Sequence, residues 1–273
     1  MNGRRIEART RGQQHGFIRR MVSPGDAISE RIKPFVFLDF IDAPVADGTG
    51  FGWHPHSGIA TLTYALDADL AYEDTAGQEG LVKATGLEWM RAGGGTWHQG
   101  RIHPHGPRVT AFQLWLALPP ELENGPAEGI YVSPETVPQL GQVRVLLGRY
   151  GESSNPIPSP SPLLYLDVVL NAGESWTFEP PSDHRVAWMF VYRGQALVAS
   201  EALREELAVL KPGEGSVRIE ATEPCRLLLG SAVRHDHPLV LGSHSVHTSR
   251  EALARGVERI AMVGEELRAA GRR

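Results

Sequence analysis

Short apolar runs recur along the whole chain, separated by turn residues. The runs are rich in Val, Ile, Phe, Tyr and Trp and are bounded by Gly, Pro or Asp, which is typical of β-strands. The strands predicted in this way cover residues 35–40, 59–66, 109–118, 143–150, 163–170, 186–198 and 226–229. The pattern therefore predicts an all-β protein.

One segment, residues 249–268, has apolar side chains at helical spacing instead. Its apolar positions are Leu253, Val257, Ile260, Ala261 and Leu267. Thr248 and Glu251 form a T-x-x-E capping box at its start. We predict a short C-terminal helix here that covers a face or an end of the β-structure.

The chain is long enough for two domains, and two features suggest where they lie. Residues 152–162, ESSNPIPSPSP, exclude regular structure and form either an interdomain linker or a long loop. An offset of 128 residues places Tyr64 on Tyr192, a weak internal repeat. We predict an N-terminal domain of residues 1–135 and a C-terminal domain of residues 136–273, which includes the helix.

Composition narrows the classes of function. The net charge is −5 and the pI is about 6.1, so no basic field attracts nucleic acid or an anionic membrane. No apolar run approaches the roughly 18 residues needed to cross a bilayer. The single cysteine, Cys225, cannot form an internal disulfide. We expect a cytoplasmic protein that binds neither nucleic acid nor membranes.

Three histidines are the strongest candidates for chemistry. His54 and His56 are two residues apart, so on a strand both imidazoles point to the same side, as metal ligands in a β-barrel do. Continuing this alternation predicts an apolar interior lined by Ala60, Leu62 and Tyr64. His98 follows a Gly-rich turn that can hold it at the mouth of a barrel.

Several motifs together resemble the pirin family of the cupin superfamily. They are GFIRRMVSP, PFVFLDF, HPHSGIATLTYAL, EWMRAGGGTWH, FQLWLALPPELE and HTSREAL, in this order along the chain. The resemblance implies two cupin barrels, each a double-stranded β-helix or jelly roll, stacked together. It also implies a transition metal, most often iron, in the N-terminal barrel and none in the C-terminal barrel.

By this resemblance His54, His56 and His98 are the metal ligands, but the carboxylate ligand is missing. Gly100 stands at the position of the family's glutamate, and Ala60 at a second acidic position of cupins. Loss of the negative charge weakens iron binding and favours zinc, copper or nickel, or leaves the site without metal.

Another group must then act as the base, because the absent glutamate has that role in pirin-like dioxygenases. The candidates nearest in sequence are His103, His105 and Gln99, the last as a neutral additional ligand. The alternative is that His103 and His105 lie on an exposed loop and have no role. At the 128-residue offset the three ligands fall on Ser182, His184 and Arg226, which cannot form the same site.

Three functions agree with these features. The first is a metal-dependent dioxygenase like quercetin 2,3-dioxygenase, acting on a flavonol or a related aromatic substrate. The second is a non-enzymatic metal-binding protein that regulates a protein partner. The third is a metal-free bicupin that binds a small molecule. Metal content and turnover of a flavonol distinguish the three.

Overall fold

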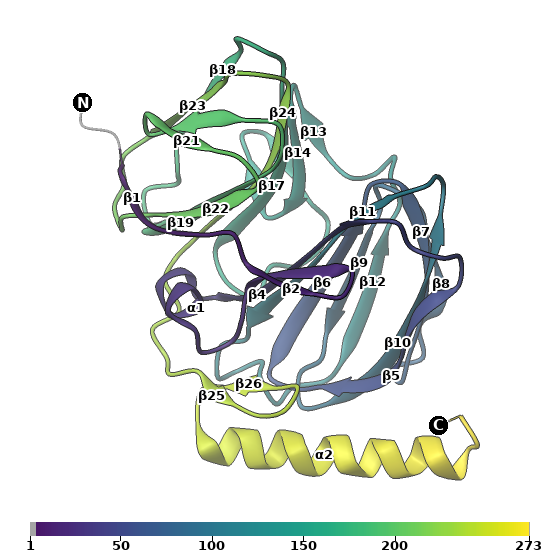
Figure 1. Ribbon diagram of the computed structural model, residues 1–273. Coiled ribbons are helices and arrows are strands. Elements are labelled where there is room, and N and C mark those ends of the chain that lie inside the picture. The colour runs from purple at the N-terminus through teal and green to yellow at the C-terminus, as the bar shows by residue number, and fades with distance from the viewer. Residues whose placement is uncertain (1–3, 273) are drawn as a thin grey trace. The chain divides into compact units, whose positions relative to one another are not determined.

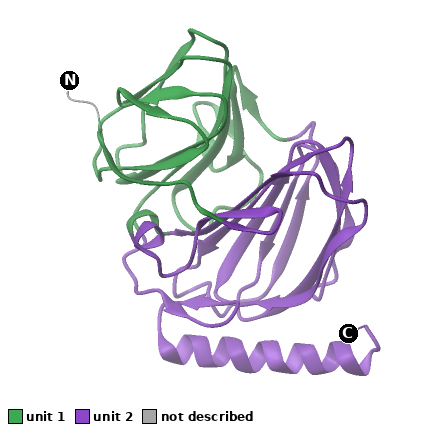
Figure 2. Cartoon of the chain, viewed as in Figure 1, with its two compact units in different colours: residues 1–13, 31–33, 137–234 green, residues 14–30, 34–136, 235–273 purple. Residues whose placement is uncertain are grey.

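The computed structural model describes residues 4–272 and confirms the all-β prediction (Figure 1). The chain divides into two compact units (Figure 2). Unit 1 consists of residues 137–234 with two short pieces, 4–13 and 31–33, and unit 2 contains residues 14–30, 34–136 and 235–272. Within the described part of the chain, neither helix is long and apolar enough to cross a membrane.

Most elements of unit 2 come from the N-terminal half of the chain. They are β2 (Gln13–His15), β3 (Ile18–Val22), β4 (Phe35–Ala43), β5 (Thr49–His56), β6 (Ile59–Ala65), β7 (Ala68–Asp74), β8 (Glu79–Val82), β9 (Leu87–Arg91), β10 (Thr96–Pro104), β11 (Val109–Ala117), β12 (Glu128–Val132), β25 (Val240–Leu241), β26 (Val246–His247) and α2 (Arg250–Ala269). A short helix, α1 (Ala27–Ile32), runs from unit 2 into the small piece of unit 1.

Unit 1 is built almost wholly of strands. They are β1 (Ile6–Thr10), β13 (Gln139–Leu140), β14 (Val143–Leu147), β15 (Arg149–Tyr150), β16 (Ser153–Ser154), β17 (Leu163–Leu170), β18 (Ser175–Phe178), β19 (Val186–Arg193), β20 (Ala196–Val198), β21 (Glu201–Leu203), β22 (Glu206–Leu210), β23 (Val217–Ala221) and β24 (Cys225–Ala232).

The two units share one topology. The larger sheet of unit 2 contains the order β9-β6-β11-β4, and that of unit 1 contains β22-β19-β24-β17. The smaller sheets have the orders β5-β10-β7-β8 and β18-β23-β20-β21. Two sheets of this kind facing each other form a jelly-roll barrel, so each unit is a cupin barrel and the predicted repeat of one fold is confirmed.

Two of the predicted strands are interrupted by glycines. Gly148 ends β14 with φ +83°, and Gly194 separates β19 from β20 with φ +72°. A Cβ at either position would lie 2.0–2.1 Å from a backbone carbonyl oxygen. These two positions therefore require glycine. The ranges 143–150 and 186–198 were each predicted as a single strand, but each contains a turn and forms two strands.

The ends of the chain do not follow the predicted division into halves. Strand β1 pairs with β22, so the first strand belongs to unit 1, whereas α2 belongs to unit 2 and not to the C-terminal domain where we placed it. Trp97 of β10 donates its indole N–H to the carbonyl of Ile260 in α2 at 2.9 Å. Residues 152–162 lie inside unit 1, before β17, and do not link the units.

The start of α2 also differs from the prediction. Its N-cap is Ser249, whose side chain accepts a hydrogen bond from the backbone N–H of Ala252 at 3.1 Å. Thr248 is not the cap, because its N–H and its hydroxyl both donate to Glu123. Thr248 therefore binds the carboxylate of Glu123, which is distant in sequence, and does not form the predicted capping box with Glu251.

A large apolar cluster fills the space between the two sheets of unit 1. Its paired strands β18 and β23 contribute buried Trp176, Phe178, Val217 and Ile219 to one hydrophobic cluster. In unit 2 the corresponding strands are β5 and β10, which carry the three histidines. The counterpart of β10 is thus β23 and not the strand of Arg226, which corrects the mapping at the 128-residue offset. Among the described residues of unit 1, no group of three or more His, Cys, Asp or Glu side chains lies close enough together to hold a metal ion.

Candidate metal centre

The structure brings His54, His56 and His98 together at one end of the barrel of unit 2. The ring centroids are 4.2–5.1 Å apart, and a nitrogen from each ring lies within 4.8 Å of the others. Strands β5 and β10 pair side by side here, with His98 opposite His54. The register shifts directly after this pair, and such a bulge re-aims side chains next to it. Three imidazoles in this arrangement can hold a divalent metal ion.

Backbone carbonyls orient two of the rings. The Nδ1 atom of His54 lies 2.7 Å from the carbonyl oxygen of Gly52, and Nδ1 of His56 lies 3.1 Å from that of His244. A carbonyl can only accept, so each Nδ1 carries the proton and each Nε2 keeps a lone pair. The buried Nε2 of His98 has no hydrogen-bond partner among the described residues. These nitrogens fit a metal ion, which needs lone pairs of this kind.

The rings are also held neutral. Burial lowers the pKa of His54, of His56 to about 3, and of His98 well below the usual 6.5. The charges of neighbouring imidazoles lower the pKa values of His56 and His98 further. A metal competes with protons for the same lone pairs, so neutral imidazoles favour metal binding at neutral pH.

The three histidines line a cavity of about 250 Å³. One of its walls is aromatic: Trp115 lies 4.8 Å from His56 and stacks on Phe37 at 4.1 Å. The guanidinium of Arg20 lies over the other part of this wall, 4.4 Å from the ring of Phe37. Arg20 also makes a bidentate pair with the buried carboxyl of Asp39. A flat aromatic molecule can make apolar contacts with such a wall.

The side chains that face this cavity are not those predicted. Ala60, Leu62 and Tyr64 are buried on the opposite face of the sheet, because the turn at Ser57 and Gly58 changes the alternation between β5 and β6. Thr63 is the residue of β6 that lines the cavity, and from β11 the cavity is lined by Ala111, Phe112, Gln113 and Trp115. The prediction of a wholly apolar interior is therefore wrong.

A row of three polar side chains crosses this wall of the cavity and was missed from the sequence. Glu88 on β9 lies opposite Thr63 on β6, which lies opposite Gln113 on β11. The Oγ1 atom of Thr63 is 2.6 Å from Glu88 Oε2 and 2.9 Å from Gln113 Oε1. Burial raises the pKa of Glu88. The sequence did contain a signal for this row, because Glu88 is a charged residue between the apolar residues Leu87 and Trp89.

The bases suggested by sequence proximity lie elsewhere. The Nδ1 atom of His103 is 2.9 Å from Asp47, and Nε2 of His105 is 3.0 Å from Asp69; both side chains are about half exposed and neither lines the cavity. Gln99 does line it, and its amide donates to Glu73 at 2.7 Å. The structure thus brings Gln99 to the cavity but leaves His103 outside it.

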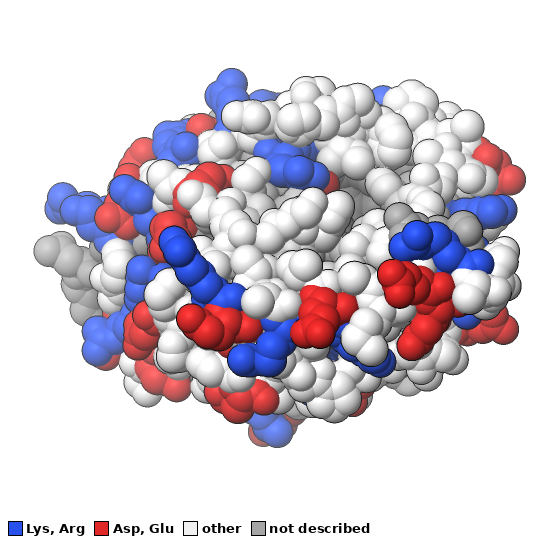
Figure 3. Space-filling view, turned by 90° about the horizontal axis from the view of Figure 1, so that it is seen from below, with Lys and Arg blue, Asp and Glu red and all other residues white. Residues whose placement is uncertain are grey.

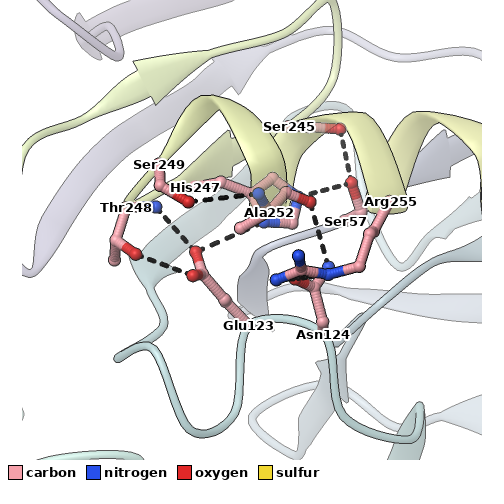
Figure 4. Close-up of polar contacts among 9 residues, drawn as sticks. All are labelled: Ser57, Glu123, Asn124, Ser245, His247, Thr248, Ser249, Ala252 and Arg255. Carbon is pink, nitrogen blue, oxygen red and sulfur yellow. Dashed lines mark hydrogen bonds and ion pairs between the residues drawn. The ribbon is translucent and has the colours of Figure 1, made fainter.

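The segment that leads into α2 makes a network of polar contacts with Ser57 and Glu123 (Figure 4). Next to His56, the Oγ atom of Ser57 lies 2.8 Å from Ser245 Oγ and 2.9 Å from Nε2 of His247. The Nδ1 atom of His247 lies 3.3 Å from Glu123. Serine, histidine and carboxylate have the order of a hydrolase triad here, but all three are at most 3% exposed, so no substrate reaches them. The network holds the segment that orients His56.

Acidic and basic side chains lie interspersed on the face seen in Figure 3. A single-sign patch of the kind that binds nucleic acid is not visible on this face.

The fold and the three-histidine cluster define a bicupin with a candidate metal centre. A pirin family model matches residues 17–116. A pirin-like protein of Caulobacter vibrioides is 31% identical over 238 residues, which cover 84% of this chain and 86% of that protein. A Pseudomonas aeruginosa protein named "Putative quercetin 2,3-dioxygenase" is 32% identical over 249 residues, 84% of this chain and 85% of that protein. The chain therefore belongs to the pirin family.

Solved structures show the same fold. Quercetin 2,3-dioxygenase from Acinetobacter baumannii superposes with a TM-score of 0.86 at 22% identity, covering 95% of this chain and 97% of that one. The bacterial pirin YhhW of Escherichia coli, solved in complex with nickel(II), has a TM-score of 0.64 at 19% identity, covering 81% and 94%.

Proposed function

We propose that this protein is a metal-dependent dioxygenase that acts on a flavonol or a similar flat aromatic hydroxy compound. The observation that carries the proposal is the common cavity, in which three neutral imidazoles lie next to an aromatic wall. Relatives in sequence and in structure that are named as quercetin 2,3-dioxygenases support it.

His54, His56 and His98 would hold one divalent transition metal. Iron is the expectation from the family, but a site of three neutral imidazoles without a carboxylate also suits nickel, zinc or copper. The bound metal would supply Lewis acidity toward a substrate hydroxyl and, for iron, nickel or copper, electron transfer with dioxygen.

The protein's own part is to bind, orient and desolvate the substrate. Trp115 and Phe37 would make apolar contacts with its rings, and the small cavity would exclude water from the reacting oxygen. At about 250 Å³ the cavity lies just below the roughly 300–1,000 Å³ usual for ligand sites, which favours a compact planar substrate.

The test is elemental analysis of untagged protein, followed by oxygen uptake with quercetin. We expect near-stoichiometric metal in the wild type and loss of it in His54→Ala and His98→Ala. His103→Ala is the matched control, because it removes an imidazole outside the cavity. Wild-type protein that takes up no iron, nickel, copper or zinc on reconstitution would refute the proposal.

A further inference from the structure

The metal ligands in this cavity include no acid, yet a buried acid lies nearby on another strand. Gly100 lines the cavity where the family resemblance places a carboxylate, and Ala60 faces away from it. Glu88 lines the same cavity and is 8% exposed. Burying a carboxyl group costs free energy, so we expect Glu88 to have a function that accounts for its position in the cavity wall.

Hydrogen bonding in the polar row indicates that Glu88 can carry a proton. Thr63 has one hydroxyl proton, but its Oγ1 lies within hydrogen-bond distance of two acceptors, on Glu88 and Gln113. A protonated Glu88 resolves the conflict: it donates to Thr63, and Thr63 donates to Gln113.

The same row also accommodates the carboxylate form of Glu88. The Nε2 atom of Gln113 is buried without a partner in the described structure. If the amide of Gln113 is turned over, Nε2 donates to Thr63 and the Thr63 hydroxyl donates to the carboxylate. In both protonation states every contact along the row pairs one donor with one acceptor, as a group that gains and loses a proton requires.

The surroundings of Glu88 make its carboxylate more basic than a carboxylate in water. Burial is the main cause that raises its pKa, and the charge of Asp74 on β7 raises it further, whereas the hydrogen bond from Thr63 opposes this. Tyr72 on β7 also interacts with it electrostatically. In the same cavity Arg20 is engaged by Asp39, so it is not committed to Glu88.

We propose that Glu88 is a catalytic residue, the proton acceptor for the substrate hydroxyl, in place of the carboxylate that the metal ligand set lacks. This inference rests on the proposed function. In the step the hydroxyl O–H bond breaks, its proton forms an O–H bond with the Glu88 carboxylate, and the electron pair stays on the substrate oxygen. No oxidant is consumed in the transfer, and Thr63 and Gln113 rearrange to suit the protonated acid.

The first experiment compares wild type with Glu88→Gln, which keeps the size of the side chain, and with Glu79→Gln, an exposed control on β8. Quercetin is titrated with pH while bound to zinc-loaded and to metal-free protein without dioxygen. Its long-wavelength absorption band moves to the red when the hydroxyl ionises. We expect bound quercetin to ionise at a pH at least about one unit higher in Glu88→Gln, a tenfold change in equilibrium.

Turnover and infrared spectra complete the test. Glu88→Gln should lower kcat by about 10²–10⁴-fold at unchanged metal content. It should also remove the infrared C=O band of a protonated carboxyl, which Glu79→Gln should retain. Quercetin that does not bind, or that ionises alike in wild type and Glu88→Gln, would overturn the role of Glu88. Absence of metal or of oxygen uptake in the wild type would instead refute the proposed function, because the metal-free titration and the infrared spectra need neither.

Discussion

Glu123 should be among the most important residues for the stability of unit 2. Its buried carboxylate accepts hydrogen bonds from the N–H and the hydroxyl of Thr248, at 2.6 and 2.7 Å, and lies 3.3 Å from His247. Glu123→Ala removes the acceptor of two hydrogen bonds from the part-buried Thr248 and the carboxylate beside buried His247. A lost hydrogen bond to a charged acceptor that leaves its donor unsatisfied costs about 1–3 kcal/mol, and two such bonds are lost.

We therefore expect Glu123→Ala to lose about 4 kcal/mol of unfolding free energy. At about 2–4 °C per kcal/mol for a protein of this size, Tm should fall by roughly 8–16 °C. Urea unfolding and calorimetry measure both, and Glu121→Ala is the control because Glu121 is exposed on the same loop. Metal affinity should also fall, by about 10–100-fold, since the segment that orients His56 is loosened. A stability loss below about 1 kcal/mol would show that water replaces the carboxylate and that the reasoning is wrong.

Three further predictions concern packing, pH and the cavity. A Cβ at Gly256 would lie 2.5 Å from Ser57 Oγ, so Gly256→Ala should cost about 1–3 kcal/mol in thermal unfolding, whereas Gly106→Ala, with nothing within 4 Å, should cost less than about 0.5 kcal/mol. Because burial raises the pKa of Glu88 above 4.5, the stability it contributes is present below about pH 4.5 and is lost as pH rises through its folded-state pKa. Urea unfolding from about pH 5 to about pH 8 should thus show the wild type losing stability relative to Glu88→Gln; a constant difference would contradict the shift. Arg20→Met should cost about 1–3 kcal/mol by leaving the buried Asp39 carboxyl without its partner, and adding Asp39→Asn should restore much of it; simple additivity in urea unfolding would contradict the pairing.

Most of the secondary structure could be predicted from local patterns in the sequence. Alternation and turn residues were enough to locate the long strands and the C-terminal helix, because both depend on neighbours within a few residues. The assignment of β1 and α2 to units was not predictable in this way. It depends on the pairing of Ile6 with Leu210 and on the contact of Trp97 with Ile260, which join residues far apart in sequence.

The candidate site, too, could be predicted only where it depends on residues close together in the sequence. His54 and His56 could be paired from their spacing, and His98 was added by its Gly-rich turn and by the resemblance to pirins. Glu88 could not be recognised as part of the cavity, because the two-residue turn at Ser57 and Gly58 reverses which face of β6 points inward. A one-residue change of alternation moves every side chain of a strand to the other face.

The carbonyl that orients His56 belongs to His244, 188 residues further along the chain. At a synthesis rate of about 5–20 residues per second, the ribosome adds that residue roughly 10–40 s after His56. During this interval the histidines exist without the segment that sets the direction of one ring. If the three histidines bind a metal ion as proposed, a nascent chain should hold it only loosely, and capture of the ion in its mature geometry would be a late event in the biogenesis of the protein.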